Sequence, residues 1–114
     1  MDVKLTKDAD ALICALYNSY HEKRKSDESR AAAKLMGSAE TIRDNIVPNW
    51  ALIDIEDICW ELKHAGFLNI LGADNTVYSA VLSDDAIIYM EDRFKNGLSE
   101  FLSYLEQIKS ILLW

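Results

Sequence analysis

Residues 54–91 constrain the fold more than any other part of this chain, because helix and strand signals follow one another there with short joints. Ile55, Ile58 and Leu62 recur at helical spacing and predict a helix over residues 54–65. Gly66 ends this helix, since glycine adopts the left-handed conformation of a helix end without steric cost. A strand is expected directly after it.

A β-hairpin is predicted for the residues that follow. Residues 67–71 and 76–82 are rich in apolar and β-branched side chains, and a polar turn separates them. Ser83 then marks the start of another helix, because its hydroxyl can accept a hydrogen bond from an unpaired helix amide. Asp84 and Asp85 favour the first turn of that helix electrostatically. This order predicts a mainly α fold with a small β-hairpin wing.

Further helices are expected before this stretch. The first begins after Thr6, whose hydroxyl is a suitable helix cap. After a start signal at residues 26–28, the alanine-rich residues 30–36 predict a helix that a glycine stops. Residues 39–46 predict a short helix that ends before a proline. The region 26–49 is the least regular, and one helix with a loop is an alternative to two short helices.

The last part of the chain, residues 84–114, reads as one long helix or as two helices hinged at residues 96–97. Apolar side chains repeat there every seven residues over four heptads, which is typical of a helix that packs against a partner helix. The alternative is packing on its own domain. A dimer interface is predicted at Ile87, Phe94, Leu98, Phe101, Leu105, Ile108, Leu112 and Trp114.

Residues 59–68 resemble the end of the third helix and the first wing strand of winged-helix proteins. Residues 81–91 are similar to the strand exit and final helix of the same superfamily, including the small bacterial and phage-borne YjcQ-like group. The resemblance implies a winged-helix domain over residues 1–95 and a C-terminal helical extension over residues 96–114. It also implies DNA binding by a transcriptional regulator, with the third helix entering the major groove and basic residues holding phosphates.

The distribution of charge opposes strong DNA binding. The chain has 114 residues and a net charge of −7. Residues 1–47 hold eight Lys or Arg against eight Asp or Glu, whereas residues 48–114 hold four bases against eleven acids. DNA-binding modules usually carry the opposite bias, because neutralised phosphates supply much of their affinity. The predicted third helix opens with acids, and the wing tip lacks Lys and Arg.

A small set of bases forms the candidate DNA-binding surface. These residues are Lys23, Arg24, Lys25, Arg30, Lys34, Arg43 and Lys63. A solvated helix end and loop is the alternative interpretation of the first five, since acids interleave with them.

No sequence pattern indicates an enzyme, a cofactor or a metal site. His21 and His64 lie far apart, and the four glycines are isolated rather than grouped in a phosphate-binding loop. Cys14 and Cys59 lie among apolar neighbours and are expected to be buried thiols. Without a secretory signal or a membrane-spanning run, we expect a soluble cytoplasmic protein.

Two functions follow from these observations. The first is a homodimeric winged-helix DNA-binding regulator, which is favoured because winged-helix proteins commonly bind DNA. The second is an acidic winged-helix module that binds a basic protein partner without DNA, which the charge distribution favours.

Overall fold

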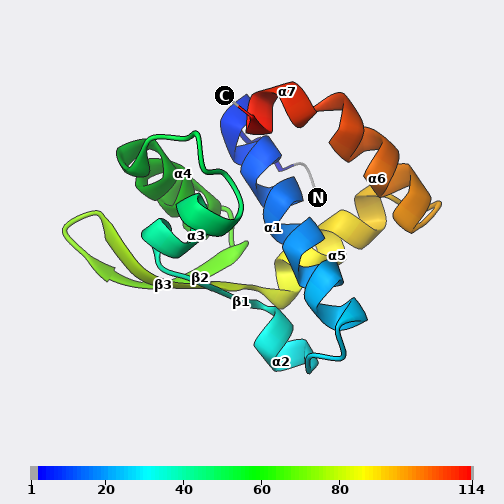
Figure 1. Cartoon of the computed structure of the whole chain (residues 1–114), viewed down its shortest axis with the longest axis horizontal. Helices are drawn as coiled ribbons and strands as arrows, with labels where there is room; N and C mark the ends of the chain where they lie inside the picture. The colour runs from blue at the N-terminus through cyan, green and yellow to red at the C-terminus, as the bar shows by residue number, and fades with distance from the viewer. Residues whose placement is uncertain (1–2, 114) are drawn as a thin grey trace.

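A computed structural model describes residues 3–113 (Figure 1). It is mainly α-helical with a small antiparallel sheet, as the sequence predicts. The elements in chain order are α1 (Lys7–Lys25), α2 (Arg30–Ala33), β1 (Leu35–Gly37), α3 (Ala39–Asn45), α4 (Leu52–His64), β2 (Leu68–Ala73), β3 (Thr76–Leu82), α5 (Asp84–Arg93), α6 (Leu98–Gln107) and α7 (Lys109–Leu112).

The sheet has the strand order β1-β3-β2, and both pairings are antiparallel. Strands β2 and β3 form the predicted wing hairpin, which projects beyond the helices (Figure 1). Strand β1 corrects the expectation of a helix over residues 30–36, because α2 ends at Ala33. Pairing of Leu35 with Val81 and burial of Met36 outweigh the helical propensity of the alanine run.

The tip of the wing is a tight turn. Asp74 and Asn75 both have positive φ, at 50° and 68°, as the two central residues of a type I′ hairpin turn require. Gly72 precedes this turn where the two strands approach closely, since an added Cβ would lie 2.1 Å from the Thr76 carbonyl oxygen. The pairing shifts next to Gly72, so that Tyr78 of β3 is an extra residue in the ladder.

The capping residues explain where the helices begin. Thr6, Ser38 and Ser83 each accept a hydrogen bond from the backbone amide three residues later, which confirms Thr6 and Ser83 as predicted caps. The start signal at residues 26–28 was misplaced, because Ser29 is the residue that caps α2. Asp27 instead has a φ of 65° and belongs to the turn after α1.

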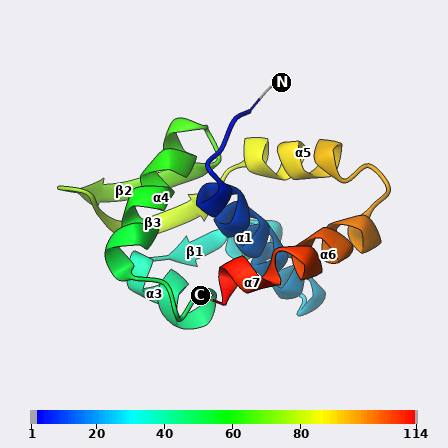
Figure 2. The ribbon, with the colours of Figure 1, turned by 90° about the horizontal axis from the view of Figure 1, so that it is seen from above.

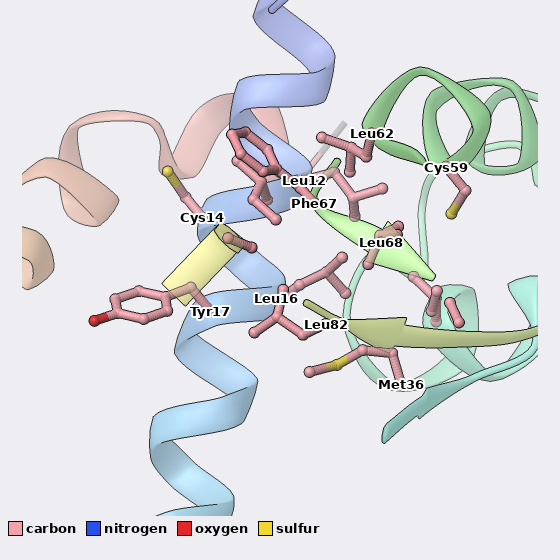
Figure 3. Packing of buried hydrophobic residues seen from close by; sticks show 14 of the residues in the cluster. Leu12, Cys14, Leu16, Tyr17, Met36, Cys59, Leu62, Phe67, Leu68 and Leu82 are labelled. Carbon is pink, nitrogen blue, oxygen red and sulfur yellow. The ribbon is translucent and has the colours of Figure 1, made fainter. Parts of the chain in front are cut away.

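Helix α1 is the centre of the core and is contacted from several sides (Figure 2). Its Leu12 and Leu16 lie on the side of the sheet, where Leu16 faces Leu82 of β3 (Figure 3). Cys14 and Tyr17 lie on the opposite side of the helix, toward α6. One hydrophobic cluster therefore joins the sheet, α4 and the C-terminal helices through α1.

The C-terminal residues fold back on this core instead of continuing as one helix. Helix α5 ends at Arg93, and Gly97, with a φ of 96°, precedes α6, so the predicted hinge at residues 96–97 is confirmed. A second break at Ile108 separates α6 from α7. The indole of Trp50 donates a hydrogen bond of 3.1 Å to the carbonyl of Ile111, which holds α7 beside the loop before α4.

Candidate interaction surface

Helix α4 and the wing hairpin form the surface that the sequence predicted to meet a ligand. Two acids of α4, Glu56 in its first half and Glu61 in its last turn, form hydrogen bonds within the chain. Glu56 accepts a hydrogen bond of 3.2 Å from the amide of Val77, and Glu61 accepts bonds of 2.8 and 2.7 Å from the amide and hydroxyl of Thr6. These carboxylates therefore hold β3 and the N-terminal segment in place. Of the four acids of α4, Asp54 and Asp57 are the two exposed ones.

The outward side of α4 is apolar as well as acidic. Ile53, Asp57 and His64 recur at helical spacing opposite the buried residues of the helix, and all three are exposed. The side chain of Ile53 is 76% exposed, the largest value among the large apolar residues of the described chain. An exposed apolar side chain therefore lies on the same helix face as the Asp57 carboxylate, one turn away.

Trp60 joins α4 to the wing tip. Its indole donates a hydrogen bond of 2.9 Å to the carbonyl of Asn75, and its ring lies against Gly72. The ammonium of Lys63 lies 5.9 Å from the centre of the Trp60 ring, at the outer limit of a cation–π contact. These contacts hold the wing tip against α4.

Five of the predicted DNA-binding residues lie together at the end of α1 and on α2, but each contacts a group of its own chain. Arg30 and Lys34 share one oxygen of Asp84, at 3.0 and 2.8 Å. The hydrogen bond from Lys34 and the nearby Arg30 lower the pKa of Asp84. The remaining three contact acids or carbonyls: Lys23 donates to the carbonyl of Leu35, Arg24 to that of Glu28, and Lys25 lies 4.0 Å from Glu22.

We call these five residues, Lys23, Arg24, Lys25, Arg30 and Lys34, the basic corner. The other two predicted DNA-binding residues lie outside it. Arg43 lies on α3, 3.0 Å from Asp44, and Lys63 lies on α4. Figures 1 and 2 place α2 at the opposite end of the sheet from the wing tip. The structure therefore does not gather the seven bases into one continuous face beside α4.

The residues of the predicted dimer interface differ in how far their own chain buries them. Ile87, Phe94 and Phe101 are buried in the core of their own chain, where the sequence alternative of packing on the same domain holds. Leu105, Ile108 and Leu112 are half-buried against that core, and Leu98 is exposed. Trp114 lies outside the described residues. Because Ile87, Phe94 and Phe101 are buried within their own chain, they are not available to a second subunit. The dimer itself stays a prediction.

A polar cluster that no sequence pattern indicated joins three helices. Arg93 of α5 donates hydrogen bonds to both oxygens of Asp10 of α1, and the Tyr104 hydroxyl of α6 donates a bond of 2.6 Å to the same carboxylate. Burial opposes the charge of Arg93, but Asp10 outweighs it and raises the pKa of the guanidinium. Burial and the bond to Asp10 raise the pKa of Tyr104. The partners are up to 94 residues apart, so local spacing could not reveal them.

A hollow of about 360 Å³ opens between α1, the end of α5 and the start of α6. Tyr17, Phe94 and Phe101 line its apolar part, and His21 and Glu91 line its polar part. Burial lowers the pKa of His21. Among residues 3–113, no three His, Cys, Asp or Glu side chains are grouped to hold a metal ion.

Both cysteines are buried, as predicted, and they lie apart on different helices (Figure 3). Burial raises the pKa of each thiol to about 12, with Asp10 adding to the effect at Cys14 and Glu56 at Cys59. Because the thiolate is the reactive form, we expect both cysteines to react with a labelling reagent at pH 8 far more slowly than in the denatured chain. Counting labelled thiols by mass spectrometry checks this, and rapid labelling of the native protein would contradict it.

Within the part of the chain that the structure describes, no helix is both long and apolar enough to cross a membrane. Comparison of the chain with protein-family models, curated proteins and solved structures finds no match. Membership of the winged-helix superfamily therefore stays a prediction from the resemblance of residues 59–68 and 81–91.

Proposed function

We propose that this protein is a non-enzymatic winged-helix module that binds an apolar and basic segment of another protein through α4. The observation that carries the proposal is the exposure of Ile53 in the first turn of that helix, where Asp54 and Asp57 are also exposed. An apolar anchor on the partner would bury Ile53, and Lys or Arg beside the anchor would meet the two carboxylates.

The contacts of the charged residues support a protein partner over DNA. Glu56 and Glu61 bind backbone amides, so they add negative potential without being available to a cation of the partner. The predicted DNA-binding bases contact groups of their own chain, and Asp84 neutralises part of the charge of Arg30 and Lys34. Phosphates would therefore meet little uncompensated positive charge near α4.

DNA binding is the second candidate, and the order of the elements favours it. A helix followed by a hairpin wing is the arrangement with which the resembled superfamily binds DNA. Exposed ion pairs are weak, so phosphates could displace Asp84 from Arg30 and Lys34. In this case DNA phosphates would bind at the basic corner beside α2, and α4 would contribute less to the affinity.

The test begins with selection of peptides from a displayed random library on the immobilised protein. We expect enrichment of sequences that combine a large apolar residue with Lys or Arg. Changing Ile53→Asp is expected to weaken their binding about tenfold or more, which corresponds to about 1.4 kcal/mol. Ile88→Asp is the matched control, because Ile88 is an exposed isoleucine on α5. If the selected peptides bind Ile53→Asp as tightly as the wild type, the peptide-binding surface does not include Ile53 of α4.

A parallel titration with labelled duplex DNA at low salt tests the second candidate. If DNA binds through the basic corner, Arg30→Ala and Lys34→Ala should each lower the slope of log affinity against log salt by roughly one unit. Asp54→Asn with Asp57→Asn should strengthen DNA binding if α4 approaches phosphate. The same pair should weaken the selected peptides if our proposal holds. Salt-sensitive DNA binding without any peptide selection would establish DNA as the ligand instead.

A further inference from the structure

Buried aromatic residues and exposed charged residues line the hollow between α1, α5 and α6. Its volume of about 360 Å³ lies within the range of about 300–1,000 Å³ that is usual for small-molecule sites. Tyr17, Phe94 and Phe101 are its buried residues, and the ring of Phe101 lies 5.0 and 5.3 Å from the other two. Glu91 and Lys95 line the same hollow and are exposed. The hollow therefore combines aromatic side chains with one charge of each sign.

A break in the helix keeps these two charges apart. Glu91 and Lys95 are four residues apart, the spacing at which Glu and Lys pair with each other on a continuous helix. Helix α5 ends at Arg93, however, and Phe94 has a ψ of 64°, outside the helical range. Lys95 therefore leaves the line of the helix, and within residues 3–113 neither Glu91 nor Lys95 takes part in an ion pair. Both charges remain available to a ligand.

The two charges have different surroundings in the hollow. Burial raises the pKa of Tyr17 and Glu91 adds to the rise, whereas at His21 Glu91 opposes the lowering of the pKa by burial. The negative charge of Glu91 therefore acts inside the hollow and favours an ammonium group there. Lys95 precedes the start of α6, where Gly97 lines the hollow and no side chain caps the first amides of the helix. A carboxylate is favoured beside such a helix start and beside a lysine.

We propose that this hollow binds a free amino acid with an aromatic side chain. The ammonium group of the ligand meets Glu91, and its carboxylate meets Lys95 and the start of α6. Its ring packs on the three aromatic side chains of the hollow. A simple amine or a simple acid would satisfy only one of the two charges, and an internal residue of a peptide carries neither group. The hollow has no residue of α4 in its lining, so this site is separate from the peptide-binding surface proposed at Ile53.

Titration of the isotope-labelled protein with phenylalanine, followed by NMR, tests the proposal. We expect saturable shifts of the signals of Tyr17, His21 and Gly97, with a dissociation constant of roughly 1 mM, which is ordinary for a ligand of about a dozen non-hydrogen atoms. Phenylalaninamide lacks the carboxylate, N-acetylphenylalanine lacks the ammonium group and alanine lacks the ring, so each should bind about tenfold or more weakly. Equal binding of all these compounds, or no saturable binding of phenylalanine at about ten times the expected dissociation constant, would overturn the proposal.

Two charge variants test the placement of the two ends of the ligand. Glu91→Gln should weaken phenylalanine about tenfold or more but should not weaken N-acetylphenylalanine, which has no ammonium group to lose. Lys95→Met should likewise weaken phenylalanine but not phenylalaninamide. Asp92→Asn and Lys109→Met are the matched controls, because both residues are exposed and lie outside the lining of the hollow. Unchanged phenylalanine binding in Glu91→Gln or Lys95→Met, or an equal loss in the controls, would overturn the proposal. Circular dichroism of every variant confirms that it is folded.

Discussion

Phe101→Ala is expected to destabilise the protein by about 3–5 kcal/mol, the cost of removing a buried phenyl ring and leaving a cavity. Phe101 is 1% exposed, and its ring lies edge-on to Tyr17 at 5.0 Å and to Phe94 at 5.3 Å. Helix α6 has Phe101 as its buried residue, so loss of this ring removes the main contact between α6 and α1. Chemical denaturation followed by circular dichroism measures the loss.

The neighbouring Leu102→Ala is the control for this change. Leu102 shares the helix and is 43% exposed, so its truncation should cost less than about 1 kcal/mol. Equal losses for the two variants would mean that α6 does not pack on α1 as described. Phe101→Ala should also widen the hollow that Phe101 and His21 line, and the reduced burial should raise the pKa of His21 toward its ordinary value.

Asp10→Ala is expected to cost about 2 kcal/mol, because it leaves a partly buried guanidinium and a tyrosine hydroxyl without their acceptor. Asp10 and Arg93 have side chains 21% and 25% exposed, which reduces the loss below that of a fully buried ion pair. Thermal unfolding at pH 7 measures it. The double variant Asp10→Ala with Arg93→Ala should cost less than the sum of the two single changes.

Asp8→Ala is the matched control for Asp10→Ala. Asp8 also lies in the first turn of α1 and is exposed, so it shares the favourable interaction with the helix dipole but not the contact with Arg93. Equal destabilisation by both changes would show that the helix dipole alone accounts for the loss of stability in Asp10→Ala. Tyr104→Phe isolates the hydroxyl and should cost about 1 kcal/mol.

Local signals predicted the hairpin and the helix caps well. Thr76–Leu82 is the observed β3, and Ser83 caps α5, because strand propensity and capping depend on residues next to each other in the chain. Strand β1 was missed because its cause is not local. Leu35–Gly37 is extended since β3, more than forty residues later, offers it hydrogen bonds.

The site was predicted less well for the same reason. Helical spacing identified the buried stripe of α4 at Ile55, Ile58 and Leu62, but the predicted helix began at residue 54 and left out Ile53. Helical spacing also could not show that Glu56 binds Val77 or that Glu61 binds Thr6. These contacts decide which acids remain available to a ligand. The same holds for the bases, since Asp84 is fifty or more residues from Arg30 and Lys34. Charge counts along a sequence do not reveal such neutralisation.

The position of α1 between the sheet and the C-terminal helices affects how the protein folds during synthesis. Tyr17 of α1 is covered by Phe101 of α6, and Trp50 holds α7 in place. The apolar side of α1 can therefore be covered only after the C-terminal helices have been synthesised. At about 5–20 residues per second, a ribosome needs on the order of ten seconds to pass from α1 to α7. During that interval an apolar helix face is exposed on the nascent chain, which makes it a natural binding segment for chaperones that hold unfinished chains.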